Sequence, residues 1–197
     1  MRILIPLMFI IIATSCMLFV SNVHTMYVYS SEKTQELTEI IIDVEYPVIE
    51  SQPGINQEEL HCLATNIYFE ARGEPVLGQI AVAQVTFNRV KSRRFPNTIC
   101  EVVYQARLNH NGNPLRNKCQ FSWYCDGMKD TIHDSTAYQR ILKLSESLIR
   151  DDNEFDDLVD GAEYYHSNKV KPYWSNQFLQ TASINDHIFY RDGLKYK

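Results

Sequence analysis

The segment Tyr68-Phe69-Glu70-Ala71-Arg72-Gly73-Glu74 ends the most regular apolar pattern of the chain. Glu70 lies three positions after Ile67, so its side chain is expected at the edge of a buried helix face and not in solvent. Burial disfavours a charged carboxyl and raises its pKa, which suits a general acid. The position equally allows a structural glutamate that is paired with Arg72 or Arg89. The pattern upstream has the spacing of one helix face and consists of Leu60, Leu63, Ala64, Ile67 and Ala71.

Capping residues predict where the helices begin and end. Asn56 is expected to be the N-cap of the first helix, with Glu59 as its capping-box partner. Gly73 ends this helix, and a second helix over residues 75–91 is apolar on most sides, which predicts a central position in the core. We interpret Glu74, between the two helices, as a structural cap of the second one.

Two further helices and several short β elements complete the expected domain. One helix opens at Thr98 with Glu101 as its capping-box partner, and another covers residues 135–150. Residues 109–118 have loop composition, and residues 120–123 alternate like a short strand or one arm of a hairpin. The segments 162–166 and 187–190 are aromatic and β-like, around a loop at 172–174. The predicted fold class is α+β, mainly helical with a small β element, in a catalytic domain at residues 56–197.

The N-terminal segment predicts export. Residues 1–20 are apolar after Arg2, which is the pattern of a cleaved signal peptide or of an uncleaved signal anchor. The length of the apolar run favours the anchor. Residues 21–55 are acidic and lack a sustained apolar period, so they are expected to be a tether. The domain is therefore expected in the periplasm, free or anchored to the inner membrane, facing the cell wall.

The cysteines agree with an oxidising compartment. Cys16 lies in the apolar segment, and the other four are an even number, as disulfides require. Zinc is disfavoured because the closest pair, six positions apart, lacks the spacing of a zinc knuckle. Two disulfides are expected, and all three pairings remain open. The four cysteines are Cys62, Cys100, Cys119 and Cys125.

Charge and histidine spacing exclude other classes of function. The formal net charge is -5, so the basic surface of a nucleic-acid-binding protein is not expected. His166 and His187 are far apart and lack a metal-binding pattern of the H-x-x-E type. We therefore expect no metal, no cofactor and no nucleic-acid partner.

An ordered series of motifs covers about residues 60–191 and resembles the cell wall hydrolase family of the spore-cortex-lytic type. The series begins with residues 62–64, 68–75, 78–83 and 88–90. It continues with residues 95–100, 103–105, 119–123 and 126–127. It ends with residues 161–162, 165–166, 172–174 and 187–190.

The resemblance implies a lysozyme-like fold related to lytic transglycosylases, with peptidoglycan as the substrate. It implies that Glu70 is the catalytic acid, and it places Gln120, Ser122, Tyr165 and His166 near a glycan cleft. Gln120 and Ser122 would share one side of the predicted strand.

Aromatic side chains suit a sugar cleft because they offer apolar faces to pyranose rings and polar edges to hydroxyls. Trp123, Tyr165, Tyr173 and Trp174 are the candidates. Core packing is the competing interpretation, and it is equally good for Trp174.

The number of positioned carboxyls selects the reaction. Hydrolysis of a glycosidic bond usually needs two carboxyls. Only Glu70 is a persuasive catalytic carboxyl here. The acidic run at 151–160 has the character of a solvated loop. One acid suffices when the muramic acid 6-hydroxyl is the nucleophile and a 1,6-anhydro product forms. We therefore predict a lytic transglycosylase. The alternatives are a hydrolytic muramidase, a zinc-dependent amidase and a non-catalytic peptidoglycan-binding envelope protein.

Overall fold

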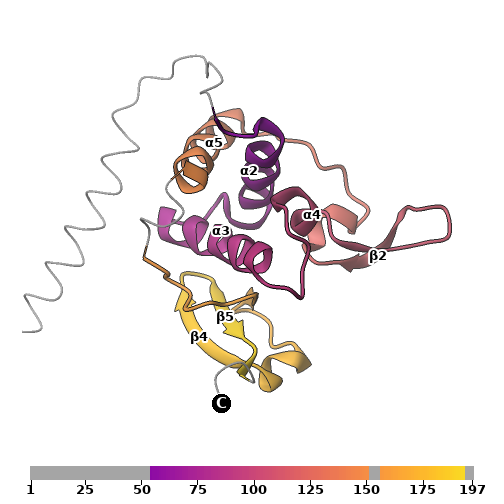
Figure 1. The fold of residues 1–197 in the computed structure, drawn as a ribbon, viewed down its shortest axis with the longest axis vertical. Coiled ribbons are helices and arrows are strands. Elements are labelled where there is room, and N and C mark those ends of the chain that lie inside the picture. The colour runs from indigo at the N-terminus through magenta and orange to yellow at the C-terminus, as the bar shows by residue number, and fades with distance from the viewer. Residues whose placement is uncertain (1–53, 151–155, 194–197) are drawn as a thin grey trace, which may run out of the picture. The chain divides into compact units, whose positions relative to one another are not determined.

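Helices are the most abundant secondary structure of the computed structural model, which describes residues 54–150 and 156–193 (Figure 1). The helices are α2 (Gln57–Ala71), α3 (Val76–Lys91), α4 (Ile99–Val103) and α5 (Ser135–Arg150), with two 3-10 helices, η1 (Ser122–Cys125) and η2 (Tyr173–Gln177). The strands are β1 (Ala106–Leu108), β2 (Pro114–Cys119), β3 (Tyr164–Ser167), β4 (Leu179–Ile184) and β5 (His187–Arg191). The predicted α+β class, mainly helical, is confirmed.

The predicted membrane segment and the tether up to residue 53 lie outside the described residues, as does Cys16. Among the helices that are described, none combines the length and the apolar character needed to cross a membrane.

The start of α2 confirms one half of the predicted capping box. Asn56 Oδ1 accepts hydrogen bonds from the backbone N–H groups of Glu58, at 2.9 Å, and Glu59, at 3.4 Å. The Glu59 carboxylate does not return to the N-cap, so that part of the prediction is wrong. Its Oε2 accepts from the backbone N–H of Ile99 at 2.6 Å, at the start of α4. A free helix N-terminus attracts a carboxylate, and this tertiary partner replaces the local one.

The predicted apolar faces of the helices are buried. All five residues of the α2 pattern are at most 2% exposed, and α2 packs against α3, α4 and α5. Ten residues of α3 are buried, as expected of a central helix. Figure 1 shows α3 between α2 and the three-stranded sheet. The predicted α5 face is also buried, at Ala137, Ile141, Leu144 and Leu148.

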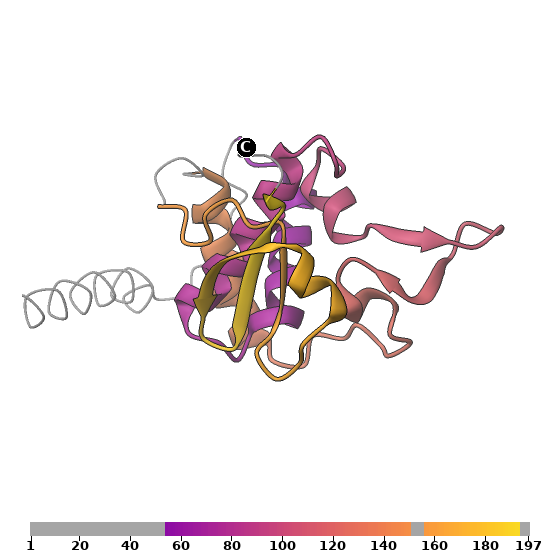
Figure 2. The ribbon, with the colours of Figure 1, turned by 90° about the horizontal axis from the view of Figure 1, so that it is seen from below.

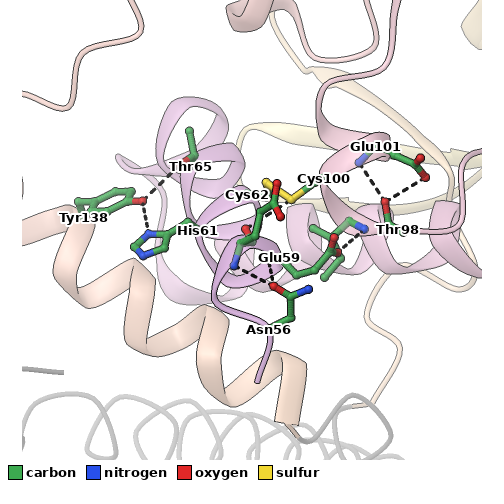
Figure 3. The surroundings of a disulfide bond; sticks show 11 residues. Asn56, Glu59, His61, Cys62, Thr65, Thr98, Cys100, Glu101 and Tyr138 are labelled. Atoms are coloured by element: carbon green, nitrogen blue, oxygen red, sulfur yellow. Dashed lines mark hydrogen bonds between the residues drawn. A yellow bond between two sulfur atoms is a disulfide. The ribbon is translucent and has the colours of Figure 1, made fainter. Parts of the chain in front are cut away.

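The structure selects one of the three disulfide pairings. Cys62 of α2 bonds to Cys100 of α4, and Cys119 bonds to Cys125. Figure 3 shows the first bond beside the two helix starts, where Thr98 Oγ1 accepts from the backbone N–H of Glu101 at 3.2 Å. The Thr98 hydroxyl also donates to the Glu101 carboxylate at 3.0 Å. The disulfide and the Glu59–Ile99 hydrogen bond therefore fasten α4 to α2 side by side.

The region between α4 and α5 departs from the prediction. Residues 109–118 are not all loop, because β2 pairs with β1 in an antiparallel hairpin that projects from the helices (Figures 1 and 2). Residues 120–123 are not a strand, since η1 begins at Ser122. The disulfide between Cys119 and Cys125 closes this turn and draws the end of β2 onto η1. A constraint of this kind is invisible to a pattern of alternating residues.

The second sheet has the strand order β3-β5-β4 and lies against α3 (Figure 2). The contact buries Phe189 of β5 with Ala81 and Val85 of α3. The turn after β4 approaches α3 so closely that a Cβ atom on Gly78 would lie 2.7 Å from Asn185 Nδ2. A larger residue at this position would require the Asn185 side chain to move. The predicted β pieces at 162–166 and 187–190 are confirmed as β3 and β5.

Removal of the two disulfides should lower stability unequally. The Cys62–Cys100 bond spans 38 residues and the Cys119–Cys125 bond spans 6, and a longer closed loop restricts the unfolded chain more. We expect Cys62→Ala/Cys100→Ala to lower the free energy of unfolding by about 4 kcal/mol and Cys119→Ala/Cys125→Ala by about 2 kcal/mol. Urea unfolding followed by tryptophan fluorescence measures both losses of unfolding free energy. Equal losses would contradict the pairing of one long-range and one short-range disulfide.

Candidate active site

A cleft of about 650 Å³ opens beside the C-terminal end of α2. Glu70 lies in its wall with Tyr68, Phe69 and Arg72 of the same helix. Ser122 and Trp123 of η1 form another part of the wall. The segment between η1 and α5 completes it with Asp126, Met128, Lys129, Asp130, Thr131, His133 and Asp134.

The Glu70 carboxyl is held by a tyrosine from the sheet. Tyr165 Oη of β3 donates a hydrogen bond to Glu70 Oε2 at 2.8 Å. Burial raises the pKa of Glu70, and the Tyr165 hydrogen bond and the positive charge of Arg89 oppose this rise only in part. Burial also raises the pKa of Tyr165 well above its usual value. The negative charge of the nearby Glu70 raises this pKa further. The tyrosine is therefore a fixed hydrogen-bond donor, and the carboxyl holds its proton more tightly than an exposed glutamate does.

Neither arginine that was considered as an ion-pair partner binds Glu70 directly. Arg89 is 4% exposed, and its Nε donates to the Glu163 carbonyl oxygen at 2.8 Å. Its guanidinium lies over the rings of Phe95 and Phe121, at 5.2 and 4.9 Å from their centroids. Burial lowers the pKa of Arg89. Arg89 thus acts on Glu70 through its charge and packs the core around it.

Arg72 belongs to the rim of the cleft. Its Nη1 donates to the carbonyl oxygen of Tyr68 at 3.4 Å, and its guanidinium lies 5.1 Å from the centroid of the Tyr68 ring. Arg72 was predicted as a structural ion-pair partner of Glu70. Its side chain instead turns back along α2 towards Tyr68 and does not pair with Glu70.

Trp123 is buried in the wall of the cleft. Its Nε1 donates to Asn66 Oδ1 at 3.1 Å, and its ring stacks on Phe69 with centroids 4.8 Å apart. These contacts fix the ring, so that only part of it can face a ligand. Ser122, which is exposed, lines the same cleft.

Gln120 and Ser122 do not share one side of a strand, as was expected, because the chain turns into η1 between them. Gln120 is exposed, and its backbone N–H donates to the Gln105 carbonyl oxygen at 2.9 Å, at the base of the hairpin. It is not among the residues that line the cleft.

His166 and Trp174 lie on the other face of the sheet from Tyr165. His166 Nε2 is 3.0 Å from Tyr190 Oη, and the two rings stack. Trp174 packs edge-on against both of these rings. Consecutive strand residues point to opposite faces, so β3 turns Tyr165 towards Glu70 and His166 away from it. The predicted glycan contacts of His166 and Trp174 have no support in the geometry of the cleft.

Glu74 does not cap α3, contrary to the prediction. Pro75 is the N-cap of α3, and no side chain caps that helix. Glu74 Oε2 instead accepts from the backbone N–H of Asp186 at 3.4 Å, in the turn before β5. This carboxylate helps to fasten the sheet to the end of α2.

Sequence reasoning missed the segment 126–134, which supplies more than half of the residues in the cleft wall. Tyr68 Oη accepts from the backbone N–H groups of His133, at 3.2 Å, and Asp134, at 3.0 Å, and so fixes the end of this segment. The segment has no apolar period that marks it. Its position directly after the Ser122–Trp123 motif was the available signal.

The cleft contains carboxyls besides Glu70, and two of them have backbone partners. Asp126 Oδ1 accepts from Met128 N at 2.7 Å, and Asp134 Oδ1 accepts from Ala137 N at 2.9 Å. Burial, and next the charge of Asp126, raise the pKa of Asp130. No group of three or more histidine, cysteine or acidic residues within 54–150 and 156–193 is arranged to hold a metal ion.

Known proteins share this chain's sequence and fold. The model of the cell wall hydrolase family matches residues 73–190, a range that begins after Glu70. The spore cortex-lytic enzyme of Oceanobacillus iheyensis is 41% identical over 143 residues, which are 73% of this chain and 45% of that protein. The enzyme of the same name from Bacillus cereus is 30% identical over 136 residues, 69% of this chain and 45% of that protein. The chain thus spans less than half the length of these relatives.

Two solved structures resemble the fold. The catalytic domain of the Bacillus cereus SleB protein has a TM-score of 0.50 and 29% identity, covering 74% of this chain and 98% of that chain. The catalytic domain of the germination-specific lytic transglycosylase SleB from Bacillus anthracis has a TM-score of 0.51 and 28% identity, covering 71% and 99%. Sequence and fold agree, and the resemblance noted from the motifs is confirmed: the chain belongs to the cell wall hydrolase family.

Proposed function

We propose that the protein cleaves the glycan strands of peptidoglycan between N-acetylmuramic acid and N-acetylglucosamine, as a lytic transglycosylase with Glu70 as its acid and base. The observation that carries the proposal is the Glu70 carboxyl in the cleft wall, with a pKa raised by burial and a fixed hydrogen bond from Tyr165. Family membership supports peptidoglycan as the substrate, and an enzyme with this substrate acts outside the cytoplasm.

The reaction needs one carboxyl that is protonated first and ionised afterwards. Glu70 donates its proton to the glycosidic oxygen while the bond to the muramic acid C1 breaks. The resulting carboxylate then takes the proton of the 6-hydroxyl as that oxygen bonds to C1, which gives the 1,6-anhydro product and restores the acid. Burial favours the first state of Glu70, and the Tyr165 hydroxyl stabilises the second. The two influences on one carboxyl match its two roles.

Hydrolysis by the same cleft is the second candidate. It usually requires another carboxyl that activates water or attacks the sugar. Asp126 and Asp134 accept backbone hydrogen bonds that fix a turn and the start of α5, which supports structural roles for both. Asp130 is the remaining carboxyl that would favour hydrolysis. A non-catalytic peptidoglycan-binding protein is the candidate from another class.

Glu70→Gln should abolish cleavage while binding persists, because an amide cannot act as a general acid or base. We expect digestion of purified sacculi to fall by at least about 100-fold, within the range of general acid catalysis, measured by mass spectrometry of the released muropeptides. The wild-type products should carry 1,6-anhydromuramic ends.

Glu74→Gln is the matched control, because it makes the same change at a carboxylate four residues later, between α2 and α3 and outside the cleft wall. It should digest sacculi at nearly the wild-type rate. Reducing muramic ends would favour hydrolysis, free stem peptides would favour a zinc-dependent amidase, and binding without any release would favour the non-catalytic candidate.

Tyr165→Phe should move the alkaline side of the pH–activity profile to higher pH. The tyrosine hydrogen bond lowers the pKa of Glu70, so its loss raises that pKa further and keeps the acid protonated at higher pH. The ionised form of Glu70 loses its donor, so the maximal rate should fall by about 10- to 100-fold, as for the loss of one hydrogen bond to a charged group. An unshifted profile would contradict a role for Tyr165 in setting this pKa.

Glu70→Gln should also stabilise the fold as the pH rises. The pKa of Glu70 is higher in the folded state than in the unfolded state. The protonated group therefore contributes fully to the free energy of unfolding at a pH below its unfolded pKa. This contribution is lost as the pH rises through the folded pKa. Glutamine has no such loss, and the difference in melting temperature between variant and wild type should grow by a few degrees between pH 4 and pH 8. Glu74→Gln serves as the control, and a constant difference would argue against a buried acid.

A further inference from the structure

The hairpin of β1 and β2 is basic, because it carries several cations and no acidic residue. Its exposed side chains include Arg107, Arg116 and Lys118, and its turn carries His110. Between Glu101 and Asp126 the sequence contains no acidic residue, although the whole chain has a net charge of -5. None of the three cations forms an ion pair with a described residue. The positive charge of the hairpin is therefore available to an external anion.

The hairpin is built as a defined structure and not as a loose loop. Asn109 Oδ1 accepts from the backbone N–H groups of Asn111, at 2.9 Å, and Asn113, at 3.0 Å. Asn109 N donates to the Asn113 carbonyl oxygen at 2.8 Å, which closes the turn. At the other end, the disulfide between Cys119 and Cys125 fixes β2 to η1. The cations are thus held in place relative to η1.

The base of the hairpin is in contact with the cleft that contains Glu70. Arg116 Nε donates to the carbonyl oxygen of Asp126 at 3.1 Å. The Arg116 guanidinium packs on Gly127, where an added Cβ atom would lie 3.2 Å from Nε. Asp126, Ser122 and Trp123 all line the cleft. A polymer that occupies the cleft and leaves it on this side therefore passes along the hairpin, which projects from the helices in Figures 1 and 2.

The cleft itself does not suit the anionic stem peptides of peptidoglycan. Three aspartates line it besides Glu70, against the cations Arg72 and Lys129. Peptidoglycan carries free carboxylates on the stem peptides of its muramic acid residues. Those carboxylates are repelled by the aspartates and attracted by a basic surface outside the cleft. Leu108 and Leu115 on the hairpin are 58% and 38% exposed, so apolar contact is available beside the charges.

We propose that the β1–β2 hairpin is a substrate-binding arm that holds the anionic stem peptides of the glycan strand whose sugars occupy the cleft. This inference rests on the proposed function, since it takes peptidoglycan as the substrate. Arg107 and Lys118 supply the charge that meets the stem carboxylates, and Arg116 joins the arm to the cleft wall.

Binding to sacculi tests the arm without interference from cleavage. The full-length chain with Glu70→Gln is compared with the same chain carrying Arg107→Gln/Lys118→Gln. The matched control carries Arg140→Gln/Lys171→Gln, which removes the same charge from exposed positions outside the hairpin and the cleft. The probes are intact sacculi, glycan strands stripped of stem peptides by an amidase, and phosphatidylglycerol vesicles, each over a range of salt concentrations.

We expect the hairpin variant to bind intact sacculi about 3- to 10-fold more weakly than the control at low salt, as for two exposed ion pairs. The difference should vanish at high salt, where exposed charges are screened, and should be absent on stripped glycan. Equal binding of the two variants to intact sacculi would overturn the proposal. So would an equal loss on stripped glycan, or a loss confined to the vesicles, which would indicate a membrane partner.

Fragment release by the wild-type chain separates this inference from the proposed function. Release of glycan fragments without any effect of the hairpin charges on binding would overturn the arm alone. Binding that depends on the hairpin charges, with no fragments released by the wild-type chain, would overturn the catalytic function and leave the arm supported.

Discussion

The hydrogen bond between Tyr165 and Glu70 joins two parts of the chain that are 95 residues apart in sequence. Both residues are partly buried, and a polar group that has lost contacts with water needs another hydrogen-bond partner. The Tyr165 hydroxyl is the donor and the Glu70 carboxylate is its acceptor. This bond exists only if β3 is docked on the helices. The contacts of Phe189 with Ala81 and Val85 of α3 serve this docking. The position of the sheet thus decides whether the carboxyl in the cleft has this hydrogen-bond donor.

The helices could be predicted because their signals are local. The apolar period of α2 and the N-cap Asn56 lie within the segment that they define, and so does the cap Thr98 of α4. The prediction failed where a distant group competed with a local one. Glu59 was expected to complete a capping box, but it binds Ile99 N, because a disulfide brings α4 beside it. Local rules of this kind hold only when no tertiary partner offers a better bond.

The site was predicted in part, for reasons that can be identified. Helical phase and the surrounding motifs pointed to Glu70, and its burial could be anticipated. The separation of Tyr165 from His166 could also have been predicted, because neighbouring strand residues face opposite ways. The turn at Ser122 could not, since the Cys119–Cys125 disulfide closes it and the sequence left the pairing open. The cleft segment 126–134 likewise depends on Tyr68, whose hydroxyl binds its backbone across 65 and 66 residues.

The division of charge between the cleft and the hairpin follows from conflicting physical demands. A carboxyl that must be protonated near neutral pH benefits from burial and from acidic neighbours, because both disfavour its ionised form. An anionic polymer requires the opposite surroundings. A cation close enough to hold the polymer at Glu70 would also lower the pKa of Glu70, as Arg89 already does in part. Exposed cations on a projecting arm avoid this conflict, because water and salt screen their effect on the acid while leaving them free to meet carboxylates at the surface.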